Sequence, residues 1–405
     1  MDQKTKSNLN RRQFVASLGV LGVVGLSPKP AFSLPEFAPE NTGNILKCGP
    51  YLQAAFAKNI TVRWITNTLC HSWVEYGSSP DNLDNIAQTI DDGLIQANNT
   101  VHAITLTSLN PGSTYYYRVV SKNIDNFHPY KLKFGETFTS KVYSFVSQDD
   151  QKSEFEFLVF NDIHDRPESF AALAKYQNSV NKDFIFLNGD MFNWQIDEDQ
   201  LVDHLLKPLC EVYSAAEIPF IFSRGNHETR GQFARQLGDY FDGREQKFYY
   251  SFQKGPLYVI VLDSGEDKDD AHAEYGGIVS FDTYRLKQKI WLEKELQKRE
   301  FKKAKYKMVF SHIPFYYSGD QHGIVHCREH WGPLLNKAKI DLLVSGHTHR
   351  HGIHPPVEGQ HNYPIVIGGG KTDGTRTVMN VKVGQNALNL QMFDDTRKLV
   401  GALNL

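Results

Sequence analysis

Between residues 154 and 350, five short apolar runs each end at side chains that can bind a metal ion. The segments that follow the runs are Asn161-Asp162-Ile163-His164, Asn188-Gly189-Asp190, Gly225-Asn226-His227-Glu228, His312, and Gly346-His347-Thr348-His349. Carboxylate, amide oxygen and imidazole without thiolate suit divalent metals such as Zn, Mn or Fe rather than a sulfur site. The pattern therefore predicts a metal-dependent centre.

Each segment taken alone has an ordinary alternative. A single Asp-x-His or His-x-His pair is usually a capping or surface pair. Asp190 after Gly189 could be a turn residue, and His312 before Pro314 could be a loop histidine with its hydrogen bonds satisfied. The prediction depends on five such segments occurring in order, each behind an apolar run.

The sequence after residue 154 also predicts the scaffold that brings these segments together. Apolar runs of strand length alternate with helical stretches, which indicates βαβ units and a sheet covered by helices on both faces. The predicted helices span residues 168–178, 198–215, 282–299 and 328–338. Because α/β sheets bind ligands beyond the carboxyl ends of their strands, we expect the five segments to converge.

Two local features favour this convergence. Alternate residues of a strand face the same side, so Asp162 with His164, and His347 with His349, could each direct a pair of side chains into one site. Glycines at positions 189, 225 and 346 would let the backbone approach closely at the turns.

Residues 43–147 have the pattern of a small β-domain. Short segments alternate with period two and are rich in Thr and aromatic residues, which predicts a β-sandwich. Three such segments are residues 60–65, 72–76 and 101–106. The stretch 109–119 resembles the tyrosine corner of fibronectin type III domains, in which a Tyr near a strand start bonds back to upstream backbone. That resemblance concerns the fold and not the function.

The first 33 residues predict a removable export signal. Basic residues precede an apolar run of about 12 residues, and Ala31-Phe32-Ser33 supplies the small residues of a cleavage site. A bilayer core needs about 20 apolar residues, so we expect no stable membrane anchor. Asn10-Arg11-Arg12-Gln13-Phe14 resembles a bacterial twin-arginine signal. That resemblance implies the twin-arginine export machinery as a partner and a periplasmic or secreted protein.

The composition excludes several other classes. The chain of 405 residues with 40% hydrophobic residues suggests two or three domains with ample core. Its 44 Lys plus Arg against 46 Asp plus Glu leave no basic footprint for nucleic acid. Four cysteines without a C-x-x-C pair rule out a cysteine zinc finger, and Cys48 with Cys70 is the guess for any disulfide. Of the 16 histidines, nine lie between His312 and His361.

The five segments together resemble the calcineurin-like metallophosphoesterase superfamily, whose blocks run D-x-H, G-D, G-N-H, a single H, and G-H-x-H. The match spans residues 154–350. The chain is also similar to purple acid phosphatases in three features. These are the preceding β-sandwich, Tyr51-Leu52-Gln53 near its start, and the run His312-Ile313-Pro314-Phe315-Tyr316. The resemblance implies a fibronectin type III-like domain at 43–147 and a two-sheet α/β/β/α catalytic domain at 154–395.

Carried over block by block, the resemblance implies two metal ions, divalent or mixed-valence. One ion would be bound by Asp162, His164, Asp190 and His349. The second would be bound by Asp190, Asn226, His312 and His347, so that Asp190 bridges the pair. The resemblance also assigns His227 as the catalytic group that protonates the leaving alkoxide or bonds a phosphate oxygen. The alternative for His227 is a role in orienting a metal ligand.

The chain departs from purple acid phosphatases in two places. That family has a Tyr three residues after the bridging Asp, and here the residue is Asn193. Without a tyrosinate ligand we expect no iron(III) charge-transfer colour, and His164 supplies the ligand that other metallophosphoesterases use. The fifth block also continues as Arg350-His351-Gly352, unlike the acid phosphatase pattern.

The predicted chemistry is hydrolysis of phosphate esters. Two metal ions about 3.5 to 4 Å apart can lower the pKa of a bridging water from about 15.7 toward 7 and hold the phosphate for in-line attack, which makes a metal-bridging hydroxide the nucleophile. We expect a phosphomonoesterase. The alternatives are a phosphodiesterase or nucleotide hydrolase of the same superfamily, and a non-catalytic binding or adhesion protein with structural metals. Five further residues could line a substrate pocket or lie exposed: Arg224, His322, His326, His351 and His354.

Overall fold

The computed structural model describes residues 45–405 except 57–58, 150, 175–181 and 243–247. The predicted export signal at residues 1–33 lies outside the described residues. Within the described part, no helix combines the length and the apolar character needed to cross a membrane. The described chain forms a β-domain that ends at Val146 and an α/β domain that begins at Phe155.

The β-domain is built around the 19-residue strand β2 (Asn59–Gly77). Its first half pairs with β1 (Leu46–Phe56), while its second half pairs with β3 (Asn85–Ala87) and β7 (Thr114–Asn126). The strand β6 (Ala97–Leu106) pairs with β2 in antiparallel orientation on both sides of an irregularity in the pairing register. The segments 60–65 and 72–76, predicted as separate strands, are therefore one strand, because the intervening residues stay extended while the pairing partners change.

The remaining strands complete the domain around one core. The strands β8 (Lys133–Thr139) and β9 (Tyr143–Val146) pair with β7, and β4 (Ile90–Asp91) pairs with β5 (Leu94–Ile95). The core includes the fully buried Trp64 and Tyr117.

The hydroxyl oxygen of Tyr115 accepts the backbone N–H of Asn110 at 3.0 Å. This contact confirms the back-bonding tyrosine predicted for residues 109–119.

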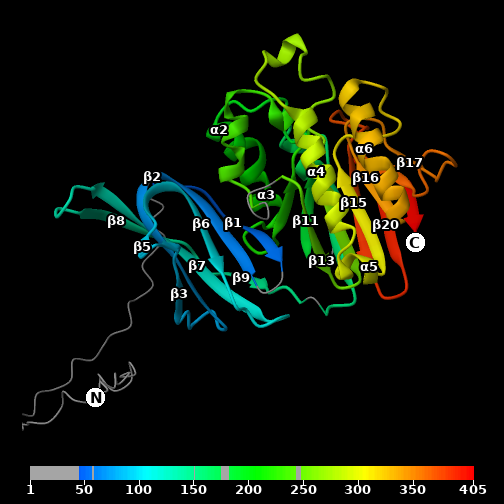
Figure 1. The fold of residues 1–405 in the computed structure, drawn as a ribbon. Helices are drawn as coiled ribbons and strands as arrows, with labels where there is room; N and C mark the ends of the chain where they lie inside the picture. The colour runs from blue at the N-terminus through cyan, green and yellow to red at the C-terminus, as the bar shows by residue number, and fades with distance from the viewer. Residues whose placement is uncertain (1–44, 57–58, 150, 175–181, 243–247) are drawn as a thin grey trace, which may run out of the picture. The chain divides into compact units, whose positions relative to one another are not determined.

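Two six-stranded sheets form the centre of the α/β domain (Figure 1). In spatial order, the first consists of β12 (Phe220–Ser223), β11 (Phe184–Asn188), β10 (Phe155–Phe160), β19 (Thr377–Val383), β20 (Leu388–Asp394) and β21 (Leu399–Asn404). The second consists of β13 (Tyr250–Lys254), β14 (Leu257–Leu262), β15 (Tyr306–Ser311), β16 (Leu342–Ser345), β18 (Ile365–Ile367) and β17 (Gly352–His354). Because β21 pairs with β20, the first sheet continues past residue 395.

Apolar side chains of the two sheets pack against each other. In β10, Phe157 and Val159 face the core between the sheets, whereas Leu158 and Phe160 face the helices on the outer side. Phe186 of the first sheet stacks on Phe310 of the second with ring centroids 3.8 Å apart. Strands buried on both faces explain the continuous apolar runs of the sequence.

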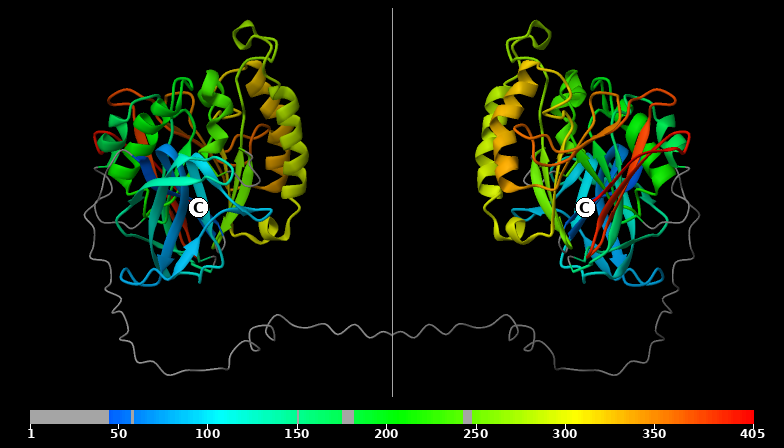
Figure 2. Two further views of the ribbon diagram at one scale, coloured as in Figure 1. Left: turned by 90° about the vertical axis from the view of Figure 1, so that its left-hand side faces the viewer. Right: turned by 90° about the vertical axis from the view of Figure 1, so that its right-hand side faces the viewer.

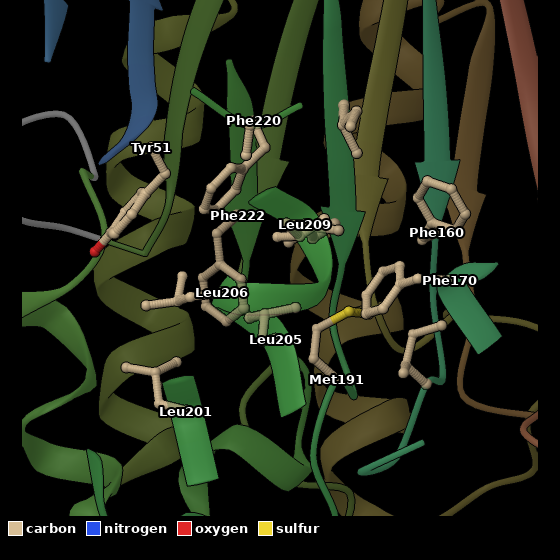
Figure 3. Close-up of a cluster of buried hydrophobic side chains, with 14 of the residues drawn as sticks. Tyr51, Phe160, Phe170, Met191, Leu201, Leu205, Leu206, Leu209, Phe220 and Phe222 are labelled. Carbon is tan, nitrogen blue, oxygen red and sulfur yellow. The ribbon is translucent and has the colours of Figure 1, made fainter. Parts of the chain in front are cut away.

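Helices cover only the outer face of each sheet. The first sheet carries α1 (Glu168–Ala174), α2 (Glu198–Leu201), the π-helical turn η1 (Val202–Leu206) and α3 (Lys207–Tyr213), whose side chains form the core in Figure 3. The second carries α4 (Phe281–Glu295), α5 (Arg299–Lys303) and α6 (His322–Ala338) (Figure 2). The α/β/β/α fold is confirmed, and the expectation of one sheet with helices on both faces is wrong, because each sheet buries its inner face on the other sheet.

The helix predicted over residues 198–215 is divided by the π-helical turn. Pro208 in the first turn of α3 lacks the amide hydrogen that a regular α-helix would use there. The helix predicted over residues 328–338 begins earlier, at His322.

The β-domain contributes to the core beneath the first sheet's helices. Tyr51 of β1 stacks on Phe220 of β12 with ring centroids 5.6 Å apart, and both rings are visible in Figure 3. The hydroxyl of the buried Tyr117 donates to the carbonyl oxygen of Ala216 at 2.6 Å. The two domains therefore share apolar and polar contacts within one compact unit.

All four cysteines are free thiols, so the guessed bond between Cys48 and Cys70 is not formed. The thiol of Cys70 donates to the carbonyl oxygen of Thr68 at 3.3 Å. The thiol of Cys48 instead lies against that of Cys210 in α3, because β1 packs on this helix.

The stacked pair between the sheets gives a stability prediction. The change Phe186→Ala removes a fully buried ring and should lower the free energy of unfolding by about 3–5 kcal/mol. Urea denaturation of the metal-free protein measures the loss. The matched control is Phe127→Ala, because Phe127 is 58% exposed and its truncation should change stability little. Equal losses in the two variants would contradict a core formed between the sheets.

Candidate metal centre

The seven predicted ligands lie just beyond the ends of five strands. Asp162 and His164 follow β10, Asp190 follows β11, and Asn226 follows β12 of the first sheet. The other three follow the second sheet, with His312 after β15 and His347 and His349 after β16. Since these strands are parallel within each sheet, their carboxyl ends meet at one edge.

Three overlapping groups of side chains could each hold a metal ion. Within each group the ligand atoms lie within 4.8 Å of one another. The groups are Asp162 with His164 and His349, His164 with Asp190 and His227, and Asp190 with His312 and His347. The eighth residue, Asn226, joins the third group because its side-chain oxygen is 3.1 Å from His347 Nδ1. All the predicted site residues therefore converge.

In the first group, two imidazole nitrogens and a carboxylate oxygen face one another. His164 Nε2 lies 3.0 Å from His349 Nε2, and Asp162 Oδ1 lies 3.5 Å and 3.2 Å from those two nitrogens. Asp162 Oδ1 is buried without a hydrogen-bond partner. An arrangement of lone pairs around a common point fits a cation better than it fits hydrogen bonding.

The third group has the same character. His312 Nδ1 donates to the backbone oxygen of Asn188 at 2.8 Å, which leaves its Nε2 with the lone pair in the neutral ring. That Nε2 is buried, makes no hydrogen bond and lies 3.0 Å from Asp190 Oδ2. Metal-binding imidazoles are commonly oriented by such a bond from the opposite ring nitrogen.

Asp190 lies between the two groups. Its Oδ2 is 3.0 Å from His312 Nε2 in the third group and 3.6 Å from His164 Nε2 in the first. No other carboxylate among the described candidate ligands belongs to two of the groups. This geometry is what a bridging ligand requires.

Backbone conformation, and not strand alternation, aims these side chains. Five of the candidate ligands have positive φ angles, namely Asp162 at 54°, His164 at 50°, Asp190 at 55°, His347 at 72° and His349 at 57°. The prediction that strand alternation pairs Asp162 with His164 is wrong, because β10 ends at Phe160. Left-handed backbone at residues other than glycine costs of order 1–3 kcal/mol each and is concentrated at functional sites.

Two glycines allow the loops to approach one another, as predicted. A Cβ at Gly189 would lie 2.6 Å from the backbone nitrogen of Gly225 and 2.7 Å from His312 Nδ1. A Cβ at Gly346 would collide with the carboxylate of Asp162. Any larger residue at either position would push the candidate ligands apart.

The charges of the centre are strongly coupled. Burial opposes the ionised form of Asp162 and Asp190, but His312 and the neighbouring imidazoles lower the pKa of both carboxyls below the usual range. Burial would lower the pKa of His312, yet the two carboxylates raise it to about 10. The described centre therefore keeps its carboxylates ionised and attracts positive charge.

Glu228 supports the centre and was given no role from the sequence. Its side chain is fully buried, and Oε2 accepts the backbone N–H groups of Asp190 at 2.8 Å and Gly225 at 2.7 Å, while Oε1 accepts that of Met191 at 2.6 Å. Burial, with the charge of Asp190, raises the pKa of Glu228 to about 7. Its position directly after Gly225-Asn226-His227 was the only signal in the sequence.

Asn193 turns its side chain away from the centre. The side-chain amide donates to Asp165 Oδ2 at 2.9 Å and to the backbone oxygen of His164 at 3.2 Å. The backbone oxygen of Asn193 accepts Nδ1–H of His227 at 2.7 Å. His227 Nε2 is thereby directed at the centre, 3.8 Å from Asp190 Oδ2.

Four of the five other possible pocket residues have structural partners, and for His351 no contact in the described part of the chain places it in the centre. Arg224 forms an ion pair with the buried Asp263 at 2.6 Å and lies over the Phe248 ring. His322 pairs with Asp282 at 2.8 Å. These contacts favour a structural role for Arg224 over contact with phosphate. Two of the remaining histidines also have partners: His326 has its Nδ1 3.7 Å from Asp282, and His354 stacks on Tyr317.

Removal of the Glu228 carboxylate should loosen the centre. In Glu228→Ala, four buried N–H groups of the ligand loops lose their acceptor, so we expect metal affinity to fall about 10–100-fold. Metal titration followed by elemental analysis measures this affinity. Glu293→Ala, at an exposed glutamate of α4, is the control and should bind metal normally. Unchanged affinity in Glu228→Ala would mean that the loops hold their shape without this residue.

Sequence comparison relates both domains to known families. Residues 155–351 match the calcineurin-like phosphoesterase family, and residues 51–147 match the purple acid phosphatase N-terminal domain. The chain is 25% identical over 324 residues to purple acid phosphatase 22 of Arabidopsis thaliana, and the match covers 74% of this chain and 65% of the plant protein. The chain thus spans slightly less than two thirds of that relative.

Two solved structures share the fold. A purple acid phosphatase from yellow lupin seeds, Lupinus luteus, superposes with a TM-score of 0.64 at 16% identity, covering 88% of this chain and 73% of the other. The structure of PhoD superposes with a TM-score of 0.63 at 12% identity, covering 91% and 90%. Residues 155–351 therefore resemble the calcineurin-like phosphoesterases in sequence, and the β-domain resembles the purple acid phosphatase N-terminal domain.

Proposed function

We propose that this protein is an exported phosphomonoesterase that uses two divalent metal ions. The observation that carries the proposal is the position of Asp190 Oδ2, which lies 3.6 Å from His164 Nε2 and 3.0 Å from His312 Nε2, between ligands assigned to different ions. One ion is assigned to Asp162, His164, Asp190 and His349, and the other to Asp190, Asn226, His312 and His347. The relatives named as acid phosphatases support this class of reaction.

Bound at these ligands, two divalent ions supply an activated water and neutralise charge on the phosphate oxygens. The chain supplies the orientation. His312 is held by the backbone of Asn188, and His227 by the backbone of Asn193, so neither ring can turn away from the centre. Left-handed backbone at five of the ligands holds these side chains just beyond the strand ends.

His227 is the residue proposed to contact the leaving oxygen. Its Nδ1 proton is committed to Asn193, so any proton for the substrate must sit on Nε2, on the side of Asp190. Burial lowers the pKa of His227, and the charge of Asp190 opposes that shift. Donation from Nε2 therefore becomes more available as the pH falls below neutral.

Two alternative functions use the same residues differently. A phosphodiesterase or nucleotide hydrolase would need the centre to accept a phosphate with a second ester group. A binding or adhesion protein would need the metals only for structure. The relation of the centre to known phosphatases and the orientation of His227 favour catalysis.

The bridging role of Asp190 gives a direct test. Asp190→Ala should lose at least one metal ion per chain and reduce turnover of an aryl phosphate monoester by several orders of magnitude, because both groups lose a shared ligand. Elemental analysis and steady-state kinetics measure the two effects. Asp203→Ala, at a surface aspartate paired with Lys207, is the control. Full metal content and activity in Asp190→Ala would refute the bridge.

Absence of turnover of both a monoester and a diester by the dimetal wild-type protein would refute the catalytic proposal.

Export through the twin-arginine route has its own test. Replacement of Arg11 and Arg12 by Lys keeps the charge of the segment while removing the paired guanidinium groups. We expect the variant to stay in the cytoplasm of a bacterial host as an uncleaved precursor, whereas Lys4→Arg should be exported normally. Cell fractionation followed by mass determination separates the outcomes. Efficient export and cleavage of the double variant would exclude this route.

A further inference from the structure

Arg230 lies beside the candidate metal centre and has no part in the ligand set. It follows the single 3-10 turn η2 (His227–Thr229), and its backbone N–H bonds to the carbonyl oxygen of His227. This turn brings the guanidinium back alongside the His227 ring. Nη1 lies 3.1 Å from His227 Nε2, which itself lies 3.8 Å from the proposed bridging oxygen of Asp190. One imidazole therefore separates this cation from the bridging carboxylate.

A buried carboxylate fixes the orientation of Arg230. Glu266, 1% exposed, accepts Nε at 2.7 Å and Nη2 at 2.8 Å in a bidentate pair. Glu266 also accepts hydroxyl groups from Thr229 at 3.0 Å and Tyr275 at 3.1 Å. Two parallel charged hydrogen bonds fix the plane of a guanidinium. In this plane Nη1 donates to His227 Nε2 at 3.1 Å and has a second N–H for another acceptor.

The side chain of Arg230 is partly exposed. The Arg230 side chain is 31% exposed and that of His227 is 24% exposed, whereas the ligands Asp162, His164, Asp190 and His312 have side chains at most 1% exposed. The ligand His349 is 37% exposed as well, so Arg230 and His227 share the solvent side of the centre with it. In the described chain Arg230 has no carboxylate on its Nη1 side within ion-pair distance. An anion that reaches the centre from solvent meets this nitrogen.

We propose that Arg230 binds a phosphate oxygen of the substrate and makes the centre selective for phosphate monoesters over diesters; this rests on the proposed phosphoesterase function. A monoester carries three unesterified oxygens and up to two negative charges. A diester has an alkyl or aryl group on one of those oxygens, so it offers one acceptor fewer and less charge. A guanidinium held in a fixed plane therefore gains a stronger charge-assisted hydrogen bond from the monoester than from the diester.

The first arm of the test measures binding without turnover. Calorimetric titration of inorganic phosphate into dimetal protein should show at least about tenfold weaker binding in Arg230→Gln than in wild type, which is the loss expected for one hydrogen bond between charged groups. Arg230→Lys should fall between the two, because it keeps the charge but loses the planar fork. Arg235→Gln, in the following turn η3 (Gln232–Arg235), removes a guanidinium that bonds only the backbone oxygen of Ile278 and should bind phosphate normally.

The second arm measures specificity. For Arg230→Gln we expect kcat/KM for an aryl phosphate monoester to fall about 100-fold, the cost of losing a donor to transition-state charge. The monoester-to-diester ratio of kcat/KM should fall by at least about tenfold, because the diester gains less from this contact. Elemental analysis must show the same metal content in both proteins.

A further variant distinguishes a loss of phosphate binding from a loss of folding. Arg230→Gln leaves the buried Glu266 carboxylate without its cation, so Arg230→Gln combined with Glu266→Gln removes both charges and keeps neutral hydrogen-bonding groups. Thermal unfolding identifies which variants are folded. The double variant should show the same loss of phosphate affinity as the single one.

The outcomes separate this proposal from the proposed function. Unchanged phosphate affinity and an unchanged ester ratio in folded, metal-loaded Arg230 variants would overturn it and leave Arg230 as a partner of Glu266. If the wild-type protein hydrolyses neither ester, the phosphoesterase function fails, and the calorimetric arm still decides whether Arg230 binds phosphate.

Discussion

Two buried carboxylates, Asp162 and Asp190, set the constraint around which the α/β domain is arranged. Buried charges of one sign oppose folding unless positive charge or hydrogen bonds compensate them. Here imidazoles from both sheets surround the pair, and their proximity keeps both carboxyls ionised. Divalent cations bound at these ligands would offset the free-energy cost of bringing the carboxylates together. They would also offset the cost of the left-handed backbone conformation that presents these carboxylates.

The two-sheet core makes this arrangement possible. Ligands from β10, β11 and β12 must meet ligands from β15 and β16, so the carboxyl edges of both sheets have to align. Contacts such as the stack of Phe186 on Phe310 hold the sheets in register through the core between them. The β-domain adds Tyr51 to the core on the far side of the first sheet. Packing remote from the centre therefore contributes to ligand geometry.

Around the ligands lies a layer of residues that fixes orientation by hydrogen bonds. Glu228 gathers backbone N–H groups from two ligand loops, and the carbonyl oxygens of Asn188 and Asn193 fix the rings of His312 and His227. Glu266 does the same for Arg230. The carboxylates therefore lie deepest and the partly exposed guanidinium lies toward solvent, so an anion that approaches from solvent would meet the guanidinium first.

The sequence by itself determined the chemistry of the centre and the class of fold. Apolar runs ending at Asp, Asn and His can be read directly, because a strand buried on both faces must be apolar and a ligand must have a donor atom. Tertiary structure decided how those residues meet. The left-handed φ angles of Asp162 and His164 depend on the turn that follows β10, and no local pattern encodes them. The supporting positions of Glu228 and Arg230, two of many charged residues, likewise depend on which loops lie next to each other in the folded chain. Long-range packing fixes such contacts, so they become visible only in the folded chain.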